Sequence, residues 1–471
     1  MIIVLLSISI ILGFCVGILS GLTPGIHVNV IASLMVAIYA SSTQSSELRL
    51  PIAVFIVSVS ITHAFFDYVP SLFLGVPTDE VYTLLPGQRM IKQGEGGKAL
   101  RLSIEGSWKG LLFSLIIAII FIILAVLNLN LLSTVDELLK PFLFWVLLAI
   151  SVFLIKDESR TAWATTIFLL SGFFGIVVLG TPLIPNGSSA AFNSLFPALS
   201  GLFGISGLLI SLADEKGKLP IQKQDISLCI SNRDVNAASL LGTISGMAVG
   251  LLPGLGSANA STLALKLTGD QNEDSNDKFY ITTTSAIQTS DALFGITALY
   301  FIQKSRSGAS VAIGALIEKI NPWETLAIVL AMGLAGFASR MLLLNSWQIF
   351  LKIINNLNYR ALTLAVITFI TLLVSLTTGF WGVMVLVAAT SLGLLPPMVN
   401  VRRSQMMGFF LIPVMLFFSG FQESFVSLFR LESQLSPSIP TNLQSIAISL
   451  GICFFTSLII YVSTSFIHKK K

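Results

Sequence analysis

The stretch GFCVGILSGLTPG at residues 13–25 recurs as GTISGMAVGLLPG at residues 242–254. In both copies three glycines are spaced four residues apart and are followed by a Pro-Gly pair. Glycines at this spacing lie on one helix face, where they let a neighbouring helix backbone come close. Proline lacks a backbone donor, so each copy predicts a helix that breaks inside an apolar run. Helices broken at matching points of two halves indicate the substrate site of a membrane transporter.

The composition is that of a membrane protein. Of the 471 residues, 54% are hydrophobic and 11% are charged, and the mean hydropathy is +0.88. The segments 161–213, 361–401 and 433–467 contain no Asp, Glu, Lys or Arg. About 20 apolar residues cross the roughly 30 Å hydrocarbon layer, so each segment holds one or two spans. The sequence therefore predicts a multi-pass protein of the cell membrane, in contact with lipid.

Other classes of protein fit the sequence less well. The net charge of +4 comes from basic residues scattered through short loops, which indicates no nucleic-acid partner. The three cysteines form no CxxC pair, so neither a disulfide framework nor a metal site is expected. HExxH and GxSxG motifs are absent, which argues against an enzyme and against a cofactor. A membrane channel, or a membrane-embedded enzyme of unknown chemistry, stays open as an alternative to a transporter.

The apolar runs predict an all-α, polytopic transmembrane helical bundle made of two related halves. Residues 1–212 form the first membrane repeat, 213–235 a cytoplasmic linker, and 236–471 the second repeat with the C-terminal helices. Seven predicted pieces separate the two breaks, so the repeats are inverted if every piece crosses the membrane and parallel if one of the seven is re-entrant. Helices are predicted at 2–22, 26–40, 50–76, 110–128, 138–155, 161–179, 193–212, 236–251, 254–267, 279–302, 322–344, 360–378, 380–397, 405–428 and 442–467.

Four stretches resemble the large permease subunit of the tripartite tricarboxylate transporters (TctA-type). They are GILSGLTPG at 17–25, LGVPT at 74–78, LPGQRMIKQGEGGKAL at 85–100 and GMAVGLLPGLG at 246–256. The LPG at 85–87, and RSGA further along the chain, look closer to the archaeal branch of this family. The resemblance implies a secondary transporter for a small organic anion, in particular a carboxylate. It also implies candidate partners: sodium or a proton, a small membrane subunit or binding protein, and a second copy of the chain.

A short helix, here called an arm, is predicted to begin after each Pro-Gly break. The first N–H groups of a helix have no intrahelical acceptor, so they and the helix dipole favour an anion. Neutral side chains near them orient a carboxylate without adding a buried charge. Alternatively, the glycines only pack helices and the hydroxyls bond back to their own helices. The candidate substrate-binding residues are Thr23, Pro24, Gly25, His27 and Asn29 in the first copy, and Pro253, Gly254, Gly256, Ser257, Asn259 and Ser261 in the second.

Two carboxylates stand in apolar surroundings, and each lies about 40 residues beyond its own Pro-Gly pair. Asp67 and Asp291 are therefore predicted to be repeat equivalents. An ionisable group inside a span is a functional candidate, and carboxylate oxygens suit sodium or can carry a proton. Both are predicted to bind the coupling ion. The alternative is that each Asp lies at a helix end. His27 is a further candidate proton carrier, because imidazole titrates near physiological pH.

Overall fold

The structure is a computed structural model in which every described regular element is helical, which confirms the all-α prediction. Six described helices are long and apolar enough to cross a membrane, and a bent pair at 131–156 gives up to seven. The chain is therefore a multi-pass membrane protein. The structure describes residues 2–421 apart from 24–25, 27, 42–44, 74–85, 130, 181–189, 214–221, 224, 229, 252–256, 258–259, 262–272, 303–306, 318 and 357.

The chain forms two compact units, and each unit draws on both halves of the sequence. Unit 1 contains Met1–Asp136 and Lys216–Tyr359, whereas unit 2 contains Glu137–Glu215 and Arg360–Lys471. Both glycine strings belong to unit 1. The predicted repeats divide the chain by the similarity of its two halves. The compact units divide it differently, because the leading helices of both halves pack together in unit 1. The repeat boundaries and the inverted orientation stay predictions.

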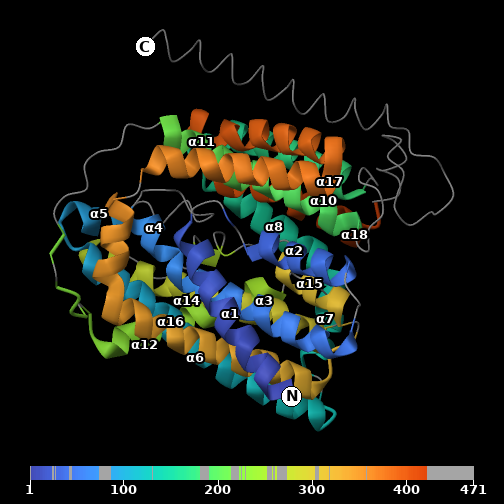
Figure 1. The fold of residues 1–471 in the computed structure, drawn as a ribbon. Coiled ribbons are helices and arrows are strands. Elements are labelled where there is room, and N and C mark those ends of the chain that lie inside the picture. The colour runs from blue at the N-terminus through green and yellow to red at the C-terminus, as the bar shows by residue number, and fades with distance from the viewer. Residues whose placement is uncertain are drawn as a thin grey trace. The chain divides into compact units, whose positions relative to one another are not determined.

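Unit 1 is built around two helix pairs, labelled in Figure 1. The helix α1 packs along α3, and α12 packs along α14 in the same way. The long helix α6 contacts α12, α14 and α16, so it joins the leading helices of the second half to the first. The helices of unit 1 are α1 (Ile2–Leu22), α2 (Val28–Ser41), α3 (Ser46–Phe66), α4 (Tyr68–Phe73), α5 (Pro86–Lys92), α6 (Gly96–Val126), α12 (Asn232–Leu251), α14 (Glu273–Phe301), α15 (Gly308–Leu316) and α16 (Pro322–Asn356).

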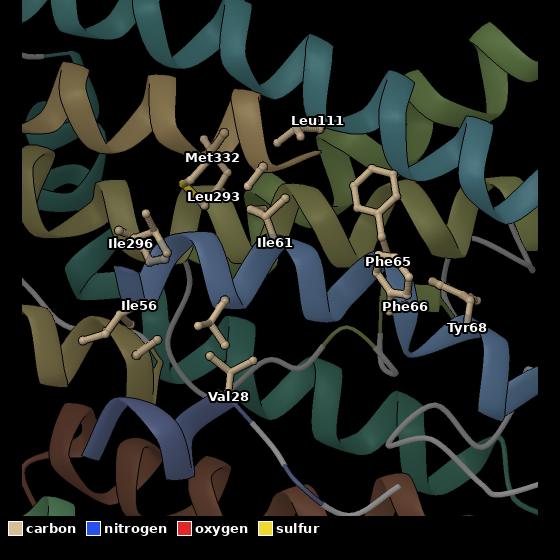
Figure 2. Packing of buried hydrophobic residues seen from close by; sticks show 14 of the residues in the cluster. Val28, Ile56, Ile61, Phe65, Phe66, Tyr68, Leu111, Leu293, Ile296 and Met332 are labelled. Carbon is tan, nitrogen blue, oxygen red and sulfur yellow. The ribbon is translucent and has the colours of Figure 1, made fainter. Parts of the chain in front are cut away.

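The core of unit 1 lies where α3, α6, α14 and α16 meet. Figure 2 shows Ile61 and Phe65 of α3 among the buried side chains of this cluster, with Leu111 of α6 and Met332 of α16. Gly336 of α16 faces three of them, because a Cβ there would stand 2.2 Å from a Leu111 methyl. The close packing of these four helices holds α3 and α14 in fixed positions within the unit.

Helix α6 begins at Gly96, well before the predicted start at residue 110. Residues 96–109 contain several charged residues, so they were not part of the apolar run from which the helix was predicted. The carboxylate of Glu105 is buried but paired: it lies 3.0 Å from Arg101 Nη2 on the same helix and 2.9 Å from Arg340 Nη2 on α16. A buried charge is tolerated when it is paired in this way. The ion pairs therefore tie α6 to α16 within unit 1.

Unit 2 is organised by two helices that cross at small residues. The helices α9 and α18 touch where a Cβ added at Gly175 would stand 2.0 Å from Phe409 O. At the helix ends, Arg402 forms ion pairs with Asp157 and Glu158. The helix α7 (Leu131–Leu139) runs from unit 1 into unit 2. The other elements of unit 2 are η1 (Lys140–Phe142), α8 (Leu143–Lys156), α9 (Thr161–Gly180), α10 (Ala190–Leu199), η2 (Ser200–Ile205), α11 (Ser206–Ala213), α17 (Tyr359–Met398), η3 (Arg403–Met407) and α18 (Gly408–Ser419).

The two helices predicted at 360–378 and 380–397 form the single element α17, with an interruption between them. Gly379 has φ 64° and ψ −158°, a conformation that favours glycine. The predicted break is therefore confirmed at this residue. The helix predicted at 405–428 ends earlier, at Ser419, where Gly420 takes the left-handed conformation with φ 76°. The helix predicted at 442–467 lies outside the described residues.

Candidate functional site

The first glycine string brings α1 into backbone contact with α3. A Cβ added at Gly17 would stand only 2.5 Å from Thr62 Cβ, and one at Gly21 would stand 2.7 Å from Phe66 Cβ. Carbon atoms in contact normally lie about 3.5–4.0 Å apart, so no larger residue fits at these positions without movement. The close approach predicted from the glycine spacing is confirmed.

The second glycine string meets α14 in the same manner. A Cβ added at Gly246 would stand 2.6 Å from Ile287 O and 2.7 Å from Ser290 Cβ. At Gly250 the added Cβ would stand 2.8 Å from Phe294 Cβ. The two halves of the chain therefore repeat the same helix contact, in which the last glycine lies beside the end of α3 in the first half and beside the second half of α14 in the second.

Atom-by-atom comparison of the last glycine in each string sets the register between the two halves. A Cβ at Gly21 meets Phe66 Cβ, His63 O and Asp67 N. A Cβ at Gly250 meets Phe294 Cβ, Asp291 O and Gly295 N. The two sets of atoms correspond one to one.

In this register Asp291 corresponds to His63, and Asp67 corresponds to Gly295. The predicted equivalence of Asp67 and Asp291 is therefore wrong by one helical turn. The sequence did hold the signal, because His63 and Asp291 lie at nearly the same distance beyond their own Pro-Gly pairs. The proposed coupling role of the two aspartates does not depend on their equivalence and stays a prediction.

His63 is joined to the first glycine string by a side-chain contact. Its Nδ1 lies 3.1 Å from Ser20 Oγ, and Ser20 is buried within the string. The Ser20 hydroxyl also lies 3.2 Å from Gly17 O in its own helix. A polar contact therefore links α1 and α3 within the last turn of α1, which ends at Leu22.

Asp67 lies at a helix junction. It follows the last residue of α3, and its backbone N–H donates to His63 O at 2.8 Å. Its carbonyl accepts from the Ser71 hydroxyl at 2.6 Å, which joins α3 to the short helix α4. This agrees with the alternative reading in which Asp67 lies at a helix end. Its side chain is only partly buried.

Asp291 lies inside a helix. It is in the second half of α14, partly buried, and its backbone faces the last turns of α12. A Cβ added at Gly295 would stand 4.0 Å from Asp291 Oδ1 and 3.9 Å from Ser307 Oγ. The two oxygens therefore both lie near the position of the absent Gly295 side chain, where there is room for a methyl group. Sequence reasoning did not single out Ser307 or Gly295 as site residues.

The arms after the two breaks are described in part. Thr23 donates its hydroxyl to Leu19 O at 2.7 Å, and Ser261 donates to Ser257 O at 2.9 Å, so both bond back to their own helices. Asn29 lies in the first turn of α2 and is partly buried. The other candidates, which are Pro24, Gly25, His27, Pro253, Gly254, Gly256 and Asn259, lie outside the described residues.

Both arms lie against the helix pairs that carry the glycine contacts. The first arm, α2, packs against α3 and against α15 of the second half. In the second arm Ala260 is buried with Val249 of α12 and Ile287 of α14. Ile287 precedes Asp291 by one helical turn. The structure therefore gathers both arms and Asp291 in unit 1.

Comparison with known proteins identifies the family of this chain. The sequence profile of the tripartite tricarboxylate transporter TctA family matches residues 8–408. An uncharacterized protein of Methanocaldococcus jannaschii is 28% identical over 415 residues, which cover 87% of this chain and 98% of that protein. No solved structure shows a significant match. The match spans both glycine strings and all the candidate residues, so the chain belongs to the tripartite tricarboxylate transporter TctA family and is a multi-pass membrane permease.

Proposed function

We propose that this protein is a secondary transporter that carries a small carboxylate across the cell membrane and couples its movement to a cation. The repeated contact of a glycine string with a partner helix supports the proposal most strongly. The last glycine of each string, which precedes the Pro-Gly pair, contacts α3 in the first half and α14 in the second, and all four helices belong to one compact unit. Broken helices of matching halves form the substrate site in many secondary transporters. Membership of a transporter family points the same way.

The carboxylate is proposed to bind at the helix starts of the two arms. Free N–H groups at a helix start, together with the helix dipole, favour an anionic group there. The hydroxyls of Thr23 and Ser261 already donate within their helices. We assign side-chain donation to Asn29 in the first turn of α2 and to Ser257 and Asn259 in the second arm.

Counterflow in proteoliposomes tests whether the protein is a transporter. Vesicles loaded with unlabelled citrate, succinate or acetate are diluted into the labelled compound. A transporter transiently accumulates label by exchange, whereas a channel only lets it equilibrate. Equilibration without overshoot for every carboxylate on the panel would favour the channel, and no flux would refute both.

The proposed binding residues are tested by single substitutions. Ser257→Ala and Asn259→Ala are expected to weaken carboxylate binding by about 1–3 kcal/mol, because each removes a hydrogen bond to a charged group. Ser261→Ala is the matched control, since its hydroxyl donates to Ser257 O. Binding is measured by the shift in thermal unfolding with added carboxylate. Equal affinity in all three variants would remove the second arm from the site.

A further inference from the structure

Three corresponding positions on one helix face carry different side chains in the two halves. In the first half the positions are Ser60, His63 and Asp67, and in the second half they are Gln288, Asp291 and Gly295. Residues three and four apart share one face of a helix, so each set lines a single face. The first half has a side chain at every position. The second half has a glycine where the first has a carboxylate, which leaves space beside Asp291.

Two oxygen-bearing side chains on this face of α14 lack partners among the described residues. Among the described residues no hydrogen bond or ion pair reaches the side chain of Asp291. One turn earlier on the same face, Gln288 Oε1 is buried and has no hydrogen-bond partner there either. A carboxylate and an amide oxygen in a helix bundle are costly when they are left unpaired. Both groups would be satisfied by a cation.

Ser307 supplies a third oxygen. It caps the start of α15, where its hydroxyl accepts from Ser310 N at 3.1 Å. A hydroxyl oxygen has two lone pairs, so one is left for another partner. This oxygen and Asp291 Oδ1 both lie about 4 Å from the position of a Cβ at Gly295. Ser307 itself is an exposed residue.

The end of α12 lies against the same place. A Cβ at Gly250 would stand 3.1 Å from Asp291 O, and α12 ends at Leu251. The carbonyls of a last helical turn have no intrahelical donor and attract cations. Half-helix ends of this kind help to coordinate the driving ion in broken-helix transporters.

We propose that Asp291, Ser307 and Gln288, with the last turn of α12, bind one sodium ion in the space beside Gly295. The ligands are all oxygens, which suit a hard cation. One carboxylate balances one positive charge, whereas a divalent ion would leave a net charge in the bundle. Among the described residues no group of three His, Cys, Asp or Glu side chains could hold another metal. The proposed site rests on the transport function proposed above. The sodium ion bound there is the coupling ion of that transport.

Sodium binding is measured without substrate, by thermal unfolding of the full chain in detergent. Choline chloride replaces sodium chloride so that ionic strength is constant, and potassium chloride is a further arm. An ion that binds only the folded state raises the unfolding temperature in a saturable way. The wild type is expected to respond to sodium alone. Equal responses to all three salts, or to none, would overturn the site.

Three variants test the residues. Gly295→Ala places a methyl group no closer than 3.9 Å to its neighbours, so the fold is kept while the ion space is filled. Gly295→Ala and Asp291→Asn should each raise the half-saturating sodium concentration at least about tenfold, the equivalent of one lost charged interaction. Ser307→Ala should also weaken binding. Ser310→Ala is its control, because it breaks the same capping pair but keeps the Ser307 oxygen. A wild-type sodium response in Asp291→Asn would refute the proposal.

Failure of this site and failure of the transport function give different results. Carboxylate counterflow by a protein that sodium does not stabilise would overturn the sodium site and leave the transport function standing. Sodium stabilisation that needs Asp291, in a protein without carboxylate counterflow, would support the site and overturn the carboxylate function.

Discussion

The contact between α12 and α14 predicts a large effect for a single methyl group at Gly246. The added Cβ would stand 2.6 Å from Ile287 O and 2.7 Å from Ser290 Cβ. Normal contacts are about 3.5–4.0 Å, so α12 has to withdraw from α14 by about 1 Å. Overpacking of this kind costs about 1–3 kcal/mol. We therefore expect Gly246→Ala to lower the free energy of unfolding by about that amount.

Unfolding of purified protein in a mild detergent is followed by tryptophan fluorescence as a denaturing detergent is added. Gly295→Ala, measured in choline chloride, is the control on the same helix pair, because its methyl group meets no atom closer than 3.9 Å. The same methyl at Gly246 would stand 3.0 Å from Asp291 N, so transport should fall as well. If Gly246→Ala unfolds like the wild type and the control, the two helices do not touch as described.

Two further predictions concern charged side chains near the helix ends. Glu105→Gln should lower the free energy of unfolding by about 3 kcal/mol, because Arg101 and Arg340 lose the buried carboxylate with which they pair. An unfolding curve like that of the wild type would contradict this. The hydrogen bond from Lys98 lowers the pKa of Glu95, so the folded chain binds this proton less tightly than the unfolded chain. The Glu95 carboxylate therefore stabilises the folded chain, by under about 1 kcal/mol because the site is partly exposed. This stabilisation is present above the pKa of Glu95 in the unfolded chain, about 4.3, and is lost as the pH falls through its lower pKa in the folded chain. Glu95→Gln should therefore be less stable than the wild type at pH 7, and the difference should shrink toward pH 4; a difference that does not change with pH would refute this.

The close approaches of the helices could be predicted from the sequence because they depend on one local property. Gly17 and Gly246 have no side chain, and their spacing puts them on one face, so the contact follows without knowledge of the partner helix. The break at Gly379 was predicted from the limits of two apolar runs, at 360–378 and 380–397. Local backbone chemistry of this kind is visible in a linear sequence.

Features that depend on partners distant in sequence could not be predicted. Glu105 lies before the predicted helix start at residue 110, because a charged residue is expected inside a span only when it is paired. Its partner Arg340 lies on another helix, far along the sequence. The space beside Gly295 is defined by Ser307 on α15, and no sequence pattern links the two residues. The sequence favoured Asp67 as the equivalent of Asp291 because both are carboxylates. The helix contacts show instead that Asp291 holds the position in the second half that His63 holds in the first.

Uptake and exchange of carboxylate, measured side by side, decide whether a cation bound at Asp291 drives transport. Proteoliposomes receive labelled carboxylate with an inward sodium gradient, or carry carboxylate on both sides without a gradient. Asp291→Asn keeps the size and one oxygen, so packing should change little. We predict that this variant loses accumulation against the gradient and keeps at least part of the exchange, and Asp67→Asn examines the first half in the same way. Normal accumulation of carboxylate by Asp291→Asn would contradict a driving role for this site.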